Sequence, residues 1–98
     1  MPEFDPIIHQ PVRLRITASL AALAQGESVE FTFLRDLLDL TDGNLGAHLH
    51  KLEDAGYVEI EKTFVDRKPK SFISLTAKGQ RAFNQHVQAL REILDDSG

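Results

Sequence analysis

The sequence of 98 residues contains no cysteine, and none of its apolar runs approaches the roughly 20 residues that a membrane-spanning helix needs. The absence of cysteine excludes disulfides, thiolate metal sites and cysteine nucleophiles, and it fits a reducing compartment. Residues 1–11 lack the basic region followed by an apolar region that marks a signal peptide. We therefore expect a cytoplasmic protein that does not associate with membranes.

The motifs of common catalytic sites are missing as well. There is no glycine-rich phosphate loop, no nucleophile elbow and no paired histidine–carboxylate metal motif. His48 and His50 stand two positions apart, so on a helix they do not face each other. Carboxylate pairs such as Glu53-Asp54 and Asp95-Asp96 are typical of solvated helix ends. The sequence therefore predicts no enzyme, no metal site and no cofactor.

What the sequence does contain is the composition of a globular protein, with 42% apolar and 27% charged residues. Its length suits one domain over residues 1–98, in which residues 1–10 form an N-terminal arm. A domain of this size buries a limited core, so a second subunit would add stability.

The net charge of −4 argues against nucleic-acid binding, because domains that bind nucleic acids are commonly basic. The charge is unevenly distributed, however. The stretch from Lys62 to Lys70 holds four basic residues and one acidic residue, a local charge of +3, so the rest of the chain carries −7. A basic segment on an acidic body can still bind phosphates, while the acidic remainder opposes loose association along a DNA backbone.

The segment from Leu40 to Val58 organises the chain and predicts a helix over residues 42–55 with two unlike faces. Thr41 is a good N-cap, because its hydroxyl can accept a hydrogen bond from a free backbone amide. Gly56 stands where a helix ends in the left-handed conformation. The residues at the spacing of a buried stripe are Leu45, Leu49 and Leu52.

The other face of this helix carries Gly46, and a glycine inside a helix costs roughly 1 kcal/mol relative to alanine. Conflicts of this kind are expected at functional sites, and small side chains let another surface approach the helix backbone. A DNA major groove is wide enough to admit a helix. The alternative is an ordinary surface helix with a neutral glycine. The candidate DNA contacts of this helix are Thr41, Gly43, Asn44, Gly46, Ala47, His50 and Lys51.

Among these candidates, Asn44 can pair with adenine edges, and His50 and Lys51 can reach bases or phosphates. His48 lies at the boundary of the buried stripe, so we expect it to be packed or hydrogen-bonded.

The N-terminal part predicts a short turn and a long helix. Asp5-Pro6 is a helix-start signal that opens a turn carrying Ile7 and Ile8. The first long helix is expected over residues 11–25 and ends at Gly26. Its buried stripe consists of Val12, Ile16, Leu20 and Leu23. Arg13 and Arg15 lie off that stripe, where they are either solvated or in reach of phosphate.

A minimal strand over residues 28–31 and a second helix over residues 33–39 follow, with Thr32 as the N-cap of that helix. The side chains expected to face inward are Leu34, Leu37 and Leu38. A tight turn at Leu40-Thr41 then leads into the helix over 42–55. This is the helix-turn-helix arrangement, whose second helix enters the major groove.

After Gly56 the apolar period changes from that of a helix to that of a strand. One face of the expected strand carries Val58, Ile60, Lys62 and Phe64. A return strand is expected over residues 71–75, and residues 65–70 form the hairpin loop between the two. The candidate DNA contacts in this loop are Arg67, Lys68 and Lys70, which can bind phosphates or enter a narrow minor groove. The alternative is a solvated basic turn.

Thr76 can cap a last helix over residues 77–95, within a dimerisation segment over residues 76–98. Its apolar side chains repeat as in a coiled-coil seam, and they are Phe83, Val87, Leu90, Ile93 and Leu94. A terminal helix after a closed core has little left to cover in its own domain. We therefore expect a two-fold dimer, with folding back onto the first helix as the alternative.

Taken together, the elements predict a mainly helical α+β fold of the winged helix-turn-helix type. Four stretches, at 9–16, 30–64, 67–79 and the following helix, make the chain resemble winged helix-turn-helix regulators of the multiple-antibiotic-resistance regulator (MarR) superfamily, especially their short single-domain members. The helix over 42–55 also resembles the recognition helix of arsenic-repressor-type regulators, whose metal-sensing thiolates have no counterpart here.

The resemblance implies a homodimer that binds double-stranded DNA and regulates transcription, as a repressor in our interpretation. The expected dimer contacts add Ile7 and Ile8 to the apolar residues of the last helix. Whether a small-molecule effector exists is left open. The alternative function is a winged-helix module that binds protein instead of DNA, which the net charge of −4 favours.

Overall fold

The computed structural model describes residues 4–97, so residues 1–3 of the expected arm and Gly98 of the expected dimerisation segment lie outside it. The chain forms the elements α1 Pro11–Ala21, β1 Ser28–Glu30, α2 Phe31–Leu37, α3 Asp42–Asp54, β2 Val58–Val65, β3 Lys68–Leu75 and α4 Ala77–Ser97. This is the predicted α+β winged helix-turn-helix, with three helices, a small antiparallel sheet and a long last helix.

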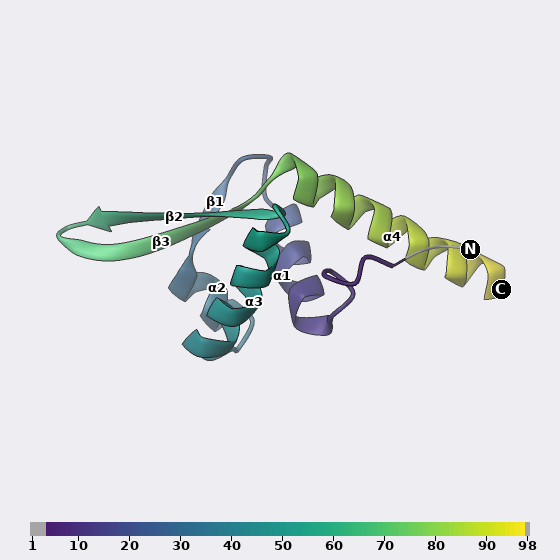
Figure 1. Ribbon diagram of the computed structural model, residues 1–98, viewed down its shortest axis with the longest axis horizontal. Helices are drawn as coiled ribbons and strands as arrows, with labels where there is room; N and C mark the ends of the chain where they lie inside the picture. Colours follow the sequence, from purple (N-terminus) through teal and green to yellow (C-terminus); the bar gives the residue numbers. More distant parts are fainter. Residues whose placement is uncertain (1–3, 98) are drawn as a thin grey trace.

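The hairpin β2–β3 and helix α4 project in opposite directions from the helical core (Figure 1). The molecule is therefore elongated, with principal extents of 54, 25 and 21 Å. None of the helices in the described part of the chain has the length and apolar character needed to cross a membrane.

The core is a single apolar cluster between α1, α2, α3 and the sheet. It contains the predicted stripe of α3, since Leu45, Leu49 and Leu52 are each at most 1% exposed. Ile16 and Leu20 of α1 complete it from one side, and the sheet contributes Val58, Ile73 and Leu75. Burial of these side chains fixes which face of α3 points outward.

Helix α1 ends at Ala21, four residues earlier than predicted, because the chain leaves the helix through short turns. The Leu23 amide donates to the Leu20 carbonyl at 3.1 Å, and the Glu27 amide donates to the Ala24 carbonyl at 3.0 Å. Gly26 takes a positive φ of 85° in these turns. The early exit brings Ser28–Glu30 alongside β3, where Val29 pairs with Ile73.

Helix α2 begins at Phe31, so Thr32 lies inside its first turn and is not the predicted N-cap. Its hydroxyl donates instead to Glu30 Oε1 at 2.9 Å. Leu34 and Leu38 are buried as predicted, but Leu37 is 58% exposed. Only a narrow stripe of side chains on this short helix packs against the core, and Leu37 lies outside that stripe.

The turn between α2 and α3 is closed by two backbone hydrogen bonds. The Leu40 amide donates to the Arg35 carbonyl at 3.0 Å, and the Asp39 amide donates to the Asp36 carbonyl at 3.2 Å. Asp39 takes the left-handed conformation with φ 54°, a position that glycine usually fills. Arg35 crosses the same turn, since its guanidinium donates to Asp42 Oδ1 at 2.7 Å. These contacts set the start of α3 relative to α2.

The start of α4 is anchored on the turn that ends α3. The Thr76 hydroxyl donates to the Gly56 carbonyl at 2.7 Å, and the Thr76 amide donates to the Tyr57 carbonyl at 3.0 Å. Thr76 also caps the helix as predicted, because its hydroxyl oxygen accepts from the Gly79 amide at 3.0 Å. A Cβ at Gly79 would lie 2.1 Å from the Tyr57 carbonyl oxygen, so only glycine fits there.

The N-terminal segment is held by side-chain hydrogen bonds. Asp5 Oδ1 accepts from the Ile7 amide at 2.8 Å, and the other Asp5 oxygen accepts from the Tyr57 hydroxyl. Ile8 is fully buried within the single chain, which corrects the prediction that it offers surface to a second copy. The turn opened by Asp5 points Ile8 inward, whereas Ile7 is half-buried at the edge of the core.

Candidate nucleic-acid interface

The outward face of α3 is the first part of the candidate interface. Thr41 caps the helix as predicted, because its hydroxyl oxygen accepts from the Asn44 amide at 3.1 Å. Opposite the buried leucines, the helix exposes Gly43, Asn44, Ala47, His50 and Lys51. These residues and Thr41 were all predicted as DNA contacts, and the structure gathers them on one side. Gly56, with φ 80°, ends the helix as predicted.

Gly46 is half-buried beside a hollow of about 170 Å³ between α3 and the hairpin. Apart from its two chain neighbours and the nearby backbone of its own helix, no heavy atom of the described residues lies within 4 Å of the place where its Cβ would stand. The fold itself therefore has room for a Cβ atom at position 46. Close packing inside the described part of the chain therefore does not explain why a glycine stands in this helix.

The tip of the hairpin is a two-residue turn, and not the six-residue loop predicted over 65–70. Val65 pairs with Lys68, so Asp66 and Arg67 alone connect the strands. Both residues have positive φ, 52° and 67°, as in the tight hairpin turn that matches the twist of paired strands. This turn could not be predicted from the sequence because the asparagine and glycine that usually mark it are absent. Arg67 is exposed at the most distal point of the hairpin.

The register divides the basic residues between the two faces of the hairpin. Lys62 pairs with Ser71 on the face that continues Val58 and Ile60 toward α3. Lys68 and Lys70 alternate onto the opposite face. Lys70 is half-buried, with its Nζ atom 3.3 Å from Glu30 Oε1, so it is already ion-paired. Of the three predicted hairpin cations, Arg67 and Lys68 are the exposed ones.

Two residues of the α3-facing side were not among the predicted contacts. Lys62 lines the hollow beside Gly46 and His50, which places a lysine between the hairpin and the outward face of α3. Phe64 follows on the same face and is 73% exposed. The alternation of the strand already placed both residues on its core-facing side. This side is longer than the core that it covers, so its outer residues are left at the surface.

Two arginines of α1 make hydrogen bonds to other elements of the fold. Arg13 donates to His48 Nδ1 at 3.2 Å and to the Ile7 carbonyl at 2.5 Å. Arg15 donates to the Leu38 carbonyl at the end of α2, at 3.0 Å. Burial, and then the positive charge of Arg13, lower the pKa of His48. His48 is thus the hydrogen-bonded histidine that the sequence predicted.

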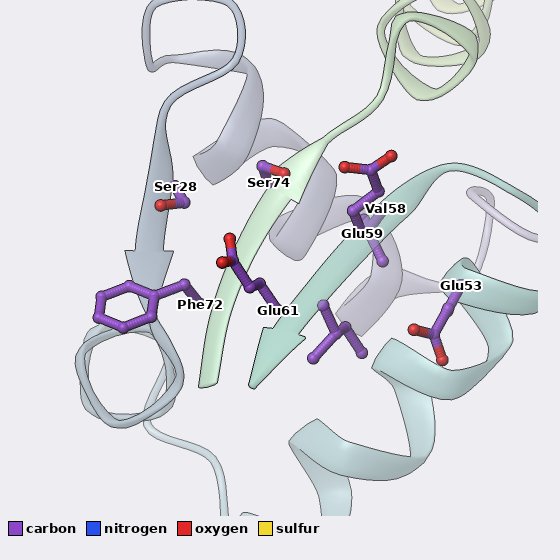
Figure 2. Close-up of a pocket in the computed structure, with 8 residues that line it drawn as sticks. Ser28, Glu53, Val58, Glu59, Glu61, Phe72 and Ser74 are labelled. Atoms are coloured by element: carbon purple, nitrogen blue, oxygen red, sulfur yellow. The ribbon is translucent and has the colours of Figure 1, made fainter. Parts of the chain in front are cut away.

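The base of the hairpin is acidic. A hollow of about 420 Å³ there is lined by Glu53, Glu59 and Glu61 together with Ser28, Phe72 and Ser74 (Figure 2). Three carboxylates repel a phosphate backbone. The exposed cations of the hairpin lie instead in its distal half, and they are Lys62, Arg67 and Lys68.

Away from this interface, α4 has two different faces. One face is buried: Gly79 lies against Tyr57 and Leu75, and the face continues with Ala82, His86 and Ala89. The predicted seam lies on another side, where Phe83 and Val87 are half-buried. Leu90, Ile93 and Leu94 are 36%, 38% and 69% exposed.

His86 is 1% exposed, and among residues 4–97 neither of its ring nitrogens has a hydrogen-bond partner. Its ring lies 5.6 Å from that of His9 and 5.2 Å from that of Phe4. Burial and the neighbouring His9 lower the pKa of His86, and Asp5 opposes them.

The chain belongs to the winged helix DNA-binding domain family, whose model matches residues 12–94. It is similar to the uncharacterized protein MJ0432 of Methanocaldococcus jannaschii, at 39% identity over 87 residues, 89% of this chain and 91% of that protein.

Among solved structures, the chain resembles a transcriptional regulator homologue from Pyrococcus horikoshii OT3, with a TM-score of 0.83 and 31% identity. That match covers 92% of this chain and 86% of the other. It also resembles NadR, solved in complex with 4-hydroxyphenylacetate, with a TM-score of 0.67, 26% identity and coverage of 93% and 64%. The prediction of a winged helix-turn-helix domain of DNA-binding transcriptional regulators is confirmed.

Proposed function

We propose that the protein is a homodimeric repressor that binds a specific sequence in double-stranded DNA. Helix α3 lies in the major groove, and the hairpin tip contacts the backbone or minor groove of the same half-site. The observation that carries this proposal is the gathering of small and hydrogen-bonding side chains on the outward face of α3. Gly46 and Ala47 allow close approach, while Asn44, His50 and Lys51 offer donors and acceptors to base edges.

The exposed stripe on α4 supports the dimer. Leu90 and Leu94 leave apolar surface uncovered in the single chain, and a second α4 related by a two-fold axis would cover it. Two half-sites would then be spaced by about one helical turn of DNA, roughly 34 Å. Repression follows if the bound dimer occludes its site from other proteins.

The experiment that tests this function is a salt titration of binding to a duplex selected from random sequence. Losing Arg67 and Lys68 together removes two phosphate-binding charges. The slope of log affinity against log salt should flatten by about 2 units. The matched control replaces Lys78 and Arg81, two exposed cations of α4, and should leave the slope unchanged. Equal slopes for wild type and the hairpin variant would remove the hairpin from the interface.

The acidic hollow and the net charge of −4 favour the second candidate, a module that binds protein. Retention on heparin separates the two functions. A protein that binds neither heparin nor any duplex at low salt would support the second candidate over the first.

A further inference from the structure

Phe64 is a large apolar side chain placed where the protein itself does not cover it. It is 73% exposed, more than any other large apolar residue in the described part of the chain. The register pairs it with Pro69, so the two rings stand opposite each other near the tip. Scattered apolar residues are normal on a surface, so the position of Phe64 carries the argument.

That position is on the α3-facing side of the hairpin. Going outward from the core along this face, Val58 is buried, Ile60 is half-buried, Lys62 lines the hollow beside Gly46, and Phe64 comes next. Its neighbour Val65 points to the opposite face. Gly46 of α3 and Phe64 therefore lie toward the same side of the molecule. A DNA duplex that α3 approaches through Gly46 would also be within reach of Phe64.

The charges around Phe64 indicate what it meets. Lys62 precedes it on the same face, and Arg67 follows at the turn, so the aromatic ring lies between two cations. The carboxylates of Glu59 and Glu61 lie nearer the base of the hairpin. A phosphate-lined groove complements this arrangement, because its backbones are anionic while its sugars and base edges offer apolar contact.

We propose that Phe64 is an apolar wedge that enters the DNA minor groove next to the major groove occupied by α3 and partly unstacks a base step there. Lys62 and Arg67 hold the flanking phosphates. This inference rests on the proposed function and adds a contact whose strength does not depend on counterion release. The affinity contributed by the hairpin therefore depends on how easily the DNA deforms at that base step, and not only on the charge of the phosphates.

The test measures binding of the selected duplex over a range of salt concentrations for Phe64→Ala and Val65→Ala. We expect Phe64→Ala to weaken binding by about 10-fold with an unchanged salt slope, since a wedge contributes packing and not charge. Val65→Ala, a smaller apolar truncation on the opposite face, should bind as wild type. Both variants should unfold at the wild-type temperature, because each side chain is exposed.

The second measurement places the fluorescent base 2-aminopurine in the step flanking the α3 half-site. Wild-type protein at saturation should raise its fluorescence by unstacking it, and Phe64→Ala should not. Wild-type affinity of Phe64→Ala, an equal loss in Val65→Ala, or an unchanged fluorescence with wild-type protein would each overturn the wedge while leaving DNA binding established. A wild-type protein that binds no duplex would instead remove the proposed function.

Discussion

Lys70 Nζ lies 3.3 Å from Glu30 Oε1, so a cation of the hairpin is paired with a carboxylate on β1. The hydrogen bond from the Thr32 hydroxyl and then the contact with Lys70 lower the pKa of Glu30, which keeps this carboxylate ionised. The pair shows that the ionic partner of a basic residue cannot be read from its neighbours in the sequence. Glu30 stands 40 positions before Lys70.

Replacing Glu30 should therefore release Lys70. We expect Glu30→Gln to raise the affinity for duplex DNA and to steepen the salt slope by up to about 1 unit, since one more cation can displace a counterion. The measurement is fluorescence anisotropy of a labelled duplex at several salt concentrations. Glu27→Gln removes the same charge from an exposed turn and serves as the control. Equal gains in both variants would mean that only the net charge matters.

Arg67 combines a charge with a strained backbone, and the two can be separated. An L residue in the left-handed region costs roughly 1 kcal/mol, whereas glycine adopts it freely. Arg67 has φ 67°. Arg67→Gly should therefore raise the free energy of unfolding by about 1 kcal/mol while weakening DNA binding.

The matched variant is Arg67→Ala, which loses the same charge and keeps the strain. It should weaken DNA binding equally without the gain in stability. Denaturant unfolding and anisotropy on the same samples give both quantities. A less stable Arg67→Gly variant would contradict the turn geometry.

Gly79 is predicted to be intolerant of any side chain. Because a Cβ would lie 2.1 Å from the Tyr57 carbonyl oxygen, Gly79→Ala must push α4 away from the end of α3. We expect a loss of about 3 kcal/mol in the free energy of unfolding, measured with denaturant. Gly43→Ala is the control. Apart from its two chain neighbours and the nearby backbone of its own helix, no heavy atom of the described residues lies within 4 Å of its Cβ position. Equal stability of the two variants would disprove the close contact at Gly79.

Stability should fall in mild acid because of His86 and His48. Both have a pKa lowered below the ordinary value near 6.5, so the folded protein binds fewer protons than the unfolded chain. Their contribution is fully present above the unfolded pKa and declines as the pH falls below about 6.5, by at most about 1.4 kcal/mol per pH unit and proton. Urea unfolding between pH 7.5 and pH 5 measures this decline.

His86→Leu should reduce the dependence on pH, since it removes one of the two groups. Gln88→Leu, the same apolar replacement at an exposed, non-titrating position of α4, is the control and should leave the dependence as it is. A wild-type stability that stays constant between these two pH values would contradict the account of His86.

The parts of the interface that follow local rules could be predicted from the sequence. Thr41, the leucine stripe and Gly56 define α3 within one stretch of chain, so its outward face followed directly. The hairpin tip could not be placed, because the tight turn uses aspartate and arginine in a conformation that usually signals glycine. The extent of both strands was misjudged for the same reason.

Contacts between distant segments could not be predicted from the sequence for a different physical reason: they depend on how the elements pack together. The burial of Ile8 depends on Asp5 joining Tyr57, and the exposure of Leu37 depends on how α2 meets the rest of the core. Phe64 and Lys62 were correctly placed on the core side of a strand. Only the structure shows that the hairpin runs on beyond the core, which turns these residues into surface.

The central claim, that α3 approaches DNA through Gly46, is tested most directly by the affinity of Gly46→Leu for the selected duplex. A Cβ at position 46 would meet open space, and a hollow of about 170 Å³ lies beside it, so the thermal unfolding temperature should not fall. The account predicts that binding becomes at least about 100-fold weaker, because the leucine holds the helix away from the base edges. A folded Gly46→Leu protein with wild-type affinity would contradict it.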